Sequence, residues 1–215
     1  MNIIETRAIK DNKKEYSTIK NVPLFSIKKT EYSLEDLDFK NIIFQSSAAV
    51  KYFKELNILK DKKVFAMGGG TKETLEKKGI SCFYPKSGGS GELLKIIKEN
   101  LIDKETLIVK GKGGLSVLKT ELTKLGFKPF EVTNYERCKF ESYKNLVNYF
   151  KDVDAIIFSS KLSAEIYFEE LHNGDKIKFF GISKRINNYV KSLGYSIEFI
   201  DYFSSGLEER IRKLI

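Results

Sequence analysis

The sequence has few cysteines, one histidine and no long apolar run. Two cysteines among 215 residues argue against a disulfide framework, and neither Cys82 nor Cys138 has a partner at metal or redox spacing, so both thiols are expected to be inert. His172 has no cysteine or carboxylate near it at ligand spacing, which predicts no metal site. Because the chain has a single histidine and no nucleophile elbow, no Ser-His-acid catalytic triad can be assembled from it.

Apolar runs such as AIIF, at Ala155 to Phe158, are far too short to span a bilayer. The N-terminal stretch lacks the apolar segment of a secretory signal. We therefore expect a cytoplasmic protein with no membrane partner.

Arginine is also scarce, because nearly all of the 38 basic residues are lysines. The net charge of +9 would suit a polyanionic partner such as nucleic acid. The lysines are spread along the chain, however, and nucleic-acid sites usually cluster arginine with aromatic residues. A solvated lysine surface is the favoured interpretation, and a nucleic-acid-associated factor is the weaker alternative.

The chain nearly repeats itself. IIFQSSAAV starts at Ile42 and IIFSSKLSA at Ile156, and each copy is followed by a second pair of similar segments, starting at Val64 and Phe179. Self-similarity at about half the chain length predicts two related domains. We place their boundaries at 1–24 with 137–215 for a discontinuous first domain, and at 25–136 for the second.

Short β-branched or aromatic runs alternate with helical stretches, which is typical of βα units and a parallel sheet. The fold class is therefore α/β. Expected strands are 2–7, 155–158, 178–182 and 197–200 in one half, and 42–44, 64–67, 82–84, 107–110 and 132–135 in the other.

Glycine and hydroxyl residues mark the expected helix ends. Gly79, Gly126 and Gly194 close periodic segments, while Thr71 and Ser90 can cap helix starts. The segment after Arg7 predicts only a short or frayed element. VPLFSI and EVTNYE are expected to cross between the two domains.

Ligands of open α/β sheets bind at the carboxyl ends of the strands, beside helix N-termini. Gln45, Ser46 and Ser47 follow one expected strand, and Ser159, Ser160 and Lys161 follow its repeat, with Gly68 to Thr71 after the next strand. Each group alone would suit a plain helix cap. The two copies together favour a site for a carboxylate or phosphate.

Two glycine-rich stretches and one tyrosine complete the candidates. GKGG at Gly111 to Gly114 lacks Walker spacing, so it is not an NTP signature, and KSGGSGE from Lys86 is best explained as a connection before a helix. Tyr135 lies at the expected crossing beside Arg137, where a phenol can donate a proton to a leaving hydroxyl.

These segments, in this order, resemble the uroporphyrinogen-III synthase family. The resemblance rests on Thr6 with Arg7, Pro23, IIFQSSAAV, VFAMGGGT, LIVKGKGG, NYE and IIFSSKLSA, and covers almost the whole chain. It implies two flavodoxin-like, doubly wound parallel-sheet domains joined by a two-stranded hinge, and a cofactor-free, metal-free monomer.

The resemblance implies that hydroxymethylbilane, a linear tetrapyrrole polycarboxylate, is closed into uroporphyrinogen III with loss of water and inversion of ring D, in haem biosynthesis. It also implies a transient contact with the preceding pathway enzyme. Tyr135 matches the tyrosine that assists departure of the hydroxyl. The implied substrate-binding residues are Arg7, Ser46, Thr71, Lys110, Gly111, Gly113, Ser160 and Ser183.

The sequence departs from the family pattern at a few positions. Gln45 stands where threonine is usual, Leu115 where many members have arginine, and Ser183 to Ile186 replace a Gly-Pro-Thr-Thr-like turn. Two alternatives stay open: a two-lobed, non-enzymatic binder of a small polyanion, and a degenerate homologue without activity.

Overall fold

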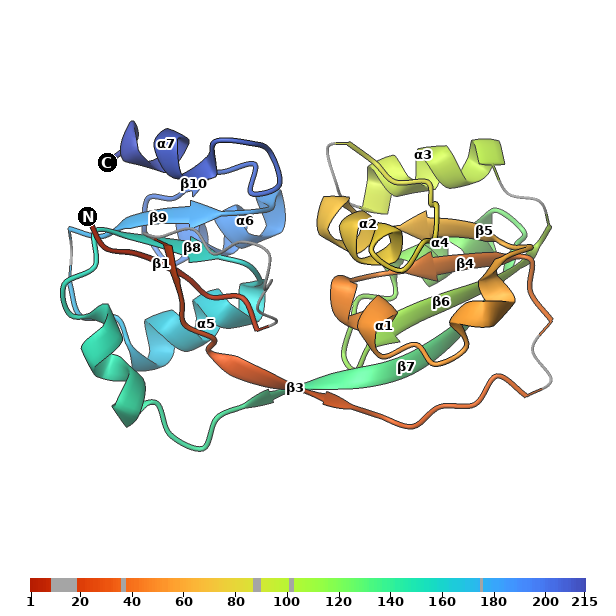
Figure 1. Ribbon diagram of the computed structural model, residues 1–215, viewed down its shortest axis with the longest axis horizontal. Coiled ribbons are helices and arrows are strands. Elements are labelled where there is room, and N and C mark those ends of the chain that lie inside the picture. The colour runs from red at the N-terminus through yellow and green to blue at the C-terminus, as the bar shows by residue number, and fades with distance from the viewer. Residues whose placement is uncertain (9–18, 36–37, 87–89, 101–102, 175) are drawn as a thin grey trace. The chain divides into compact units, whose positions relative to one another are not determined.

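The computed structural model describes residues 1–8, 19–35, 38–86, 90–100, 103–174 and 176–215 (Figure 1). The expected short element after Arg7 lies mostly outside these residues, and so do residues 87–89 of the KSGGSGE connection. The chain forms two compact units: unit 1 contains Met1–Ser26 and Cys138–Ile215, and unit 2 contains Ile27–Arg137. The sequence predicts these boundaries after residues 24 and 136.

Unit 1 contains a parallel sheet in the order β10-β9-β8-β1-β2. Its elements are β1 (Ile3–Glu5), β2 (Ile19–Asn21), a 3-10 helix (Lys144–Phe150), β8 (Ala155–Phe158), α5 (Lys161–Glu170), β9 (Lys178–Gly181), α6 (Lys184–Ser192), β10 (Glu198–Phe199) and α7 (Leu207–Arg212).

Unit 2 is built around a sheet in the order β3-β7-β6-β4-β5. Its elements are β3 (Phe25–Lys29), β4 (Asn41–Phe44), α1 (Ser47–Lys51), a 3-10 helix (Leu56–Leu59), β5 (Lys63–Ala66), α2 (Gly69–Glu76), α3 (Ser90–Asn100), β6 (Glu105–Gly111), α4 (Val117–Lys124) and β7 (Lys128–Lys139). Strands β4, β5, β6 and β7 are parallel.

Strands β3 and β7 each pass from one unit into the other. Thr30 N bonds to Asn134 O, and Ser26 Oγ to Cys138 O, so the two strands run antiparallel. This neighbouring pair is the two-stranded connection expected from the resemblance. The prediction of two α/β parallel-sheet domains is confirmed.

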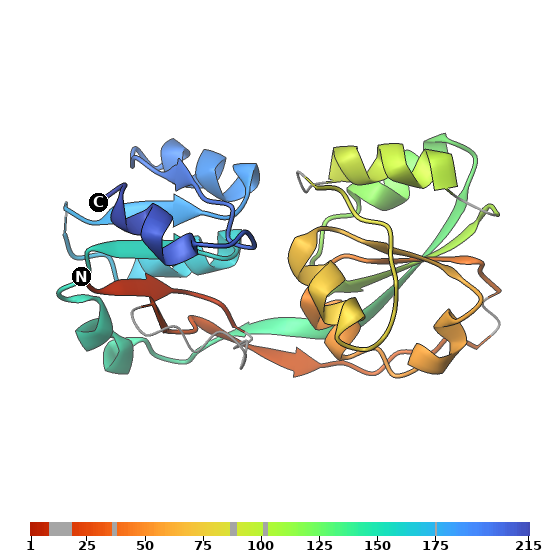
Figure 2. The same ribbon diagram turned by 45° about the horizontal axis from the view of Figure 1, so that its top comes forward.

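Each sheet is covered by helices on both faces (Figure 2). All four residues of β4 and of β8 are buried, as central parallel strands require. In unit 2, Ile43 and Ile108 pack with Leu93 of α3 and Leu122 of α4. In unit 1, residues of β1, β8 and β9 pack with Ile211 of α7. The repeated apolar runs are therefore the central strands of two cores.

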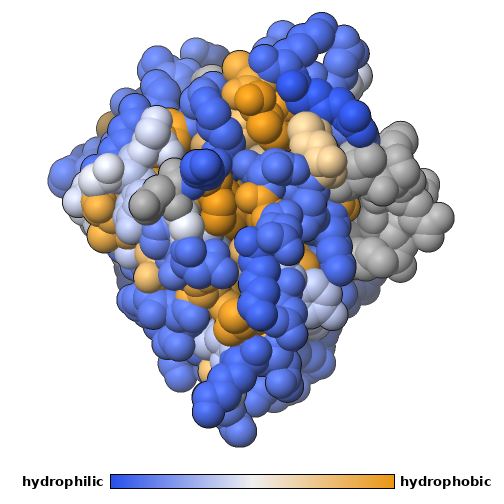
Figure 3. Space-filling model, turned by 90° about the vertical axis from the view of Figure 1, so that its left-hand side faces the viewer, coloured by the Kyte–Doolittle hydropathy of each residue, from blue (hydrophilic) through white to orange (hydrophobic). Residues whose placement is uncertain are grey.

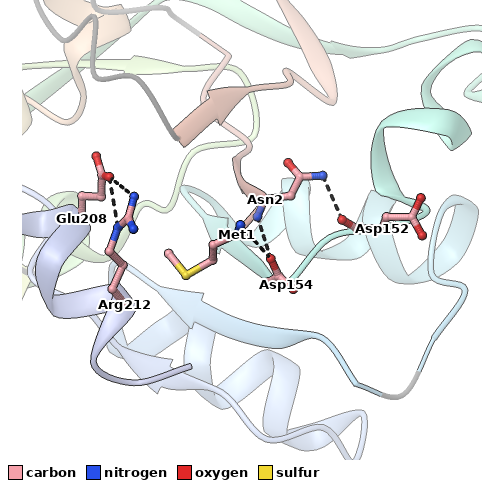
Figure 4. Close-up of polar contacts among 6 residues, drawn as sticks. All are labelled: Met1, Asn2, Asp152, Asp154, Glu208 and Arg212. Atoms are coloured by element: carbon pink, nitrogen blue, oxygen red, sulfur yellow. Dashed lines mark hydrogen bonds and ion pairs between the residues drawn. The ribbon is translucent and has the colours of Figure 1, made fainter.

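The N-terminus is held against the start of β8 by polar contacts (Figure 4). The backbone N–H of Asn2 donates to Asp154 Oδ2 at 2.6 Å, and its side-chain amide donates to Asp152 O at 2.9 Å. In α7, Arg212 pairs with Glu208 one turn earlier at 2.7 Å. The contacts of Asn2 fix β1 beside β8 from its first residue.

Figure 3 shows one face of unit 1, on which hydrophilic residues predominate and hydrophobic ones appear only in limited areas. Such a face is expected where 31% of the residues are charged.

None of the helices in the described residues has the length and apolar character that a bilayer crossing requires.

Three sequence expectations were wrong in detail. Residues 82–84 form one bridge, between Phe83 and Phe65, in place of a strand. Strand β7 runs from Lys128 to Lys139, far beyond the expected 132–135, because its pairing with β6 and β3 extends it at both ends. The expectation had also omitted β2, a strand of three residues that is too short to leave an apolar pattern.

Candidate functional site

Each sheet has one place where the strand order reverses, and the repeated motifs lie there. In unit 1 this switch point falls between β1 and β8, and in unit 2 between β6 and β4. The order β7-β6-β4-β5 in unit 2 corresponds to β2-β1-β8-β9 in unit 1, so unit 2 has the same topology with its first two strands placed last in the chain. Crevices at such points are the usual ligand sites of open α/β sheets.

Tyr135 belongs to β7, the strand beside β6, and is only 2% exposed. Its hydroxyl is 2.9 Å from Ser46 Oγ and accepts a hydrogen bond from Nη2 of Arg137 at 3.2 Å. The guanidinium carbon of Arg137 is 5.7 Å from the centre of the tyrosine ring, which adds a weak cation–π attraction. The phenol is thus held by two polar groups from two elements.

The tyrosine ring rests against Gly111 at the end of β6. A Cβ atom on Gly111 would lie 2.4 Å from Cζ of Tyr135 and 2.8 Å from its hydroxyl oxygen, so only glycine leaves room for the ring. The strand register shifts between Lys110 and Gly111, and Lys112 N donates to Tyr135 O at 2.8 Å. Gly113 follows with a φ of 69°, which favours glycine.

Serine hydroxyls cap helices at three of the repeated positions. Ser46 Oγ accepts from Ala49 N at 3.1 Å at the start of α1, and Ser160 Oγ accepts from Ser163 N at 3.1 Å in a capping box on α5. Ser183 Oγ accepts from Ile186 N at 3.4 Å at the start of α6. All three therefore have a structural role, and α5 and α6 present their N-termini at the carboxyl edge of the unit 1 sheet.

Thr71 does not cap α2, which corrects the sequence expectation. The helix begins at Gly69 with Gly68 as its N-cap, so Thr71 is the third helical residue and is 5% exposed. The flexible glycines Gly68 to Gly70 allow the helix to begin before Thr71, the first residue there with a hydroxyl group. Ser47 Oγ donates to Gly70 O at 2.8 Å and ties α1 to this turn.

Lys110 is nearly buried and its ammonium group has two partners. Nζ lies 2.7 Å from Glu131 Oε1 and 2.8 Å from Ser116 Oγ, and the side chains of Lys110 and Glu131 are 9% and 16% exposed. A substrate carboxylate at Lys110 would have to share or replace these partners. The contact with Ser116, the N-cap of α4, also anchors the loop that leads from β6 into this helix.

Arg7 lies at the carboxyl end of β1 in unit 1. Its guanidinium carbon is 4.9 Å from the centre of the Tyr202 ring and 5.8 Å from that of Phe203. Burial, reinforced by the Glu5 carboxylate that the phenol hydrogen-bonds, raises the pKa of Tyr202 to about 12. The aromatic pair gives Arg7 a fixed support.

The lone histidine and the cysteines take no part in these sites. His172 Nδ1 is 3.3 Å from the Tyr167 hydroxyl, and the imidazole packs at 4.8 Å on the Tyr195 ring. Cys82 and Cys138 are both unbonded thiols. In the described residues no group of three His, Cys, Asp or Glu side chains is arranged to hold a metal ion.

The structure brings Ser46, Tyr135 and Gly111 into direct contact in unit 2, with Lys110 next in the chain. Arg7, Ser160 and Ser183 belong to unit 1. Sequence reasoning noted Arg137 only as a neighbour of Tyr135, although residues two apart in a strand share a face. It quoted Asn134 and Thr6 only within the motifs of the resemblance and did not include them among the site residues. The buried amide of Asn134 donates to Ala49 O at 2.7 Å, and the Thr6 hydroxyl bonds Ser163 Oγ at 3.0 Å.

Known proteins of one kind resemble this chain in sequence and in structure. The sequence profile of the uroporphyrinogen-III synthase HemD family matches residues 15–201. A uroporphyrinogen-III synthase of Chlorobaculum parvum is 24% identical over 186 residues, which cover 78% of this chain and 76% of that protein.

Two crystal structures share the fold. Uroporphyrinogen-III synthetase of Helicobacter pylori superimposes with a TM-score of 0.70 at 16% identity, covering 100% of this chain and 99% of the other. A mutant uroporphyrinogen III synthase of Thermus thermophilus gives a TM-score of 0.62 at 14% identity, covering 99% and 96%.

Proposed function

Because the chain belongs to the uroporphyrinogen-III synthase family, we propose that it closes hydroxymethylbilane into uroporphyrinogen III in haem biosynthesis. In enzyme class it would be a cyclising hydro-lyase that needs no cofactor. The profile match covers most of the chain, including the end of β6, the whole of β7 and the repeated serine turns. We also propose that the protein is a monomer, that it works in the cytoplasm, and that it makes at most a transient contact with the preceding pathway enzyme.

In the proposed mechanism, Tyr135 donates its proton to the hydroxyl group that leaves ring A. The C–O bond breaks, water departs, and ring A becomes a protonated azafulvene while Tyr135 is left as the phenolate. The substituted carbon of ring D attacks this centre, and the resulting spiro intermediate reopens and recloses with ring D inverted. The proton displaced from ring D on reclosure returns to the Tyr135 oxygen, which restores the phenol. A general acid of this kind typically contributes a factor of about 10²–10⁴ to the rate.

The observation that carries this assignment is the environment of the Tyr135 hydroxyl. The ring is clamped against Gly111, and the hydroxyl lies between Ser46 and Arg137. This environment supports the proposal, because directed proton transfer requires a donor that is held in one place.

The substrate carries eight carboxylates, and we propose that both units bind some of them. Helices α5 and α6 offer free N–H groups beside Ser160 and Ser183. Arg7 adds a cation, and Ser46, Thr71, Lys110 and the loop at Gly111 and Gly113 complete the proposed set. Lys110 would contribute only by sharing its contact with Glu131.

The test is an assay of the purified chain with freshly generated hydroxymethylbilane. The products are oxidised, and the type I and type III uroporphyrins are separated by chromatography. Type III product in the presence of a strong chelator and without any added cofactor is the expected result. Type I alone, in the amount formed without protein, would contradict the proposal and leave the degenerate homologue or the polyanion binder.

A further inference from the structure

Arg137 lacks the oxygen partners that two other arginines have in α7. Arg212 pairs with Glu208, and Arg210 donates to two backbone carbonyls. Arg7, like Arg137, lies over a tyrosine ring, but it belongs to unit 1. Arg137 is exposed, and within the described residues its guanidinium pairs with no carboxylate. Its hydrogen bond goes to the Tyr135 hydroxyl instead.

The neighbouring cations at this site already have acidic partners. Lys110 is bound by Glu131 at 2.7 Å, and Lys112 lies 3.5 Å from Glu136. Arg137 is therefore the cation next to Tyr135 whose charge is not balanced by a described side chain. An exposed, unbalanced guanidinium is well suited to a carboxylate, because its planar N–H groups match both oxygens.

The direction of the Arg137–Tyr135 hydrogen bond also matters for proton transfer. A guanidinium can only donate, so the Tyr135 oxygen accepts and its own proton points elsewhere. Ser46 Oγ accepts from Ala49 N and can still donate its proton to the Tyr135 oxygen. Once the phenol has given up its proton, two donors, one of them charged, therefore face the oxygen that becomes negative.

We propose that Arg137 binds a carboxylate of the tetrapyrrole with its free N–H groups while one N–H holds the Tyr135 oxygen. Arg137 thereby touches the substrate and positions the proton donor, so that binding of an acidic side chain and departure of the hydroxyl are coupled. This inference rests on the proposed function, because it uses the polycarboxylate substrate and Tyr135 as the acid.

The kinetic test compares Arg137→Ala and Arg137→Lys with the unchanged chain, in the hydroxymethylbilane assay. Arg212→Ala is the control, because it removes the same charge from α7 in unit 1. Arg137→Ala should raise KM and lower kcat, with kcat/KM down by about 100-fold, as loss of a charge-assisted contact predicts. Arg137→Lys keeps the positive charge but loses the paired N–H groups of the guanidinium, so its kcat/KM should lie between those of Arg137→Ala and the unchanged chain.

Two further measurements separate positioning from a general structural effect. Adding methylguanidine should restore part of the kcat of Arg137→Ala and leave Arg212→Ala unchanged. The double variant Tyr135→Phe/Arg137→Ala should lose little more kcat than Tyr135→Phe, because residues that act as a unit are non-additive. A kcat/KM within twofold of the unchanged chain, or fully additive losses, would overturn the coupling.

The carboxylate contact can be tested without turnover. Uroporphyrin III, which carries the same acidic side chains, is titrated by its fluorescence into each variant. Arg137→Ala should weaken binding by at least about tenfold, and Arg212→Ala should not. Equal binding would overturn the carboxylate contact even if the chain proves inactive, whereas weakened binding without type III product would contradict the proposed function alone.

Discussion

The Tyr135 hydroxyl and Ser46 Oγ lie 2.9 Å apart, although the two residues are separated by 89 positions in the sequence. Ser46 caps α1 after the central strand β4, while Tyr135 belongs to β7, with β6 between the two strands. The contact links a helix cap to the candidate proton donor. A change at either residue should therefore affect the site as well as the local fold.

Replacing Tyr135 with phenylalanine should lower kcat by about 10²–10⁴, because the proton donor is lost while the ring still fills its place. The matched control is Tyr143→Phe in unit 1, whose hydroxyl donates to Leu24 O at 3.0 Å. That variant should lose about 1 kcal/mol of stability and keep its turnover. Single-turnover assays and urea unfolding measure the two effects, and an unchanged kcat in Tyr135→Phe would remove this residue from the mechanism.

Gly111→Ala should displace the Tyr135 ring, because the new Cβ would lie 2.4 Å from Cζ. Overpacking of this kind costs about 1–3 kcal/mol, and we expect kcat to fall at least about tenfold as the phenol moves. Gly91→Ala in α3 is the control, since a Cβ there meets nothing within 4 Å. Equal turnover in the two variants would show that the close packing of Gly111 does not position the phenol.

Lys110→Met should lower the free energy of unfolding by about 2–4 kcal/mol, because it leaves the Glu131 carboxylate largely buried with only Lys119, 3.9 Å away, as a basic partner. The double variant Lys110→Met/Glu131→Leu should regain most of this stability. The same double variant also tests substrate binding. A raised KM in a stable protein would support a carboxylate contact of Lys110, while a normal KM would limit Lys110 to holding the loop.

Stability in alkali should depend on Tyr202. Its pKa in the folded state is about 12, chiefly through burial, whereas tyrosine in an unfolded chain titrates near ~10. The folded state thus favours the protonated phenol, and the resulting stabilisation is complete below about pH 10 and is lost as the pH rises towards about 12. Urea unfolding across this range should show a steeper fall for the unchanged chain than for Tyr202→Phe, and parallel curves would contradict this assignment.

The periodic segments were predictable because local patterns define them. The runs at Ile42 and Ile156 are fully buried strands, and Gly79, Gly126 and Gly194 all have positive φ where the sequence predicts that helices end. Weak elements escaped prediction. The bridge at Phe83 and the short strands β2 and β10 depend on their neighbours for pairing.

The candidate site was predictable only in part. Tyr135 and the serine turns follow from the strand-to-helix pattern and the resemblance, but the partners of each side chain do not. Arg137 and Tyr135 lie two apart on β7, so the strand period places them on one face but does not give their hydrogen bond. Glu131 on Lys110 and Gly111 beneath the tyrosine ring are contacts between β6 and β7. No sequence period encodes these contacts, because they depend on strand register and on the register shift between Lys110 and Gly111.

The sequence by itself determined the α/β class, the duplication and the turns that carry hydroxyl and glycine residues, because these depend on hydrophobic period and local backbone preference. Only the tertiary structure decided that the two units share one topology with a different chain order. Because β4 pairs with β6 as β8 pairs with β1, Lys110 and Arg7 occupy equivalent positions in the two sheets. Lys110 is bound to a carboxylate, whereas Arg7 is stacked on aromatic rings. The physical reason is that sheet order and side-chain partners are set by packing between distant segments, which local sequence does not specify.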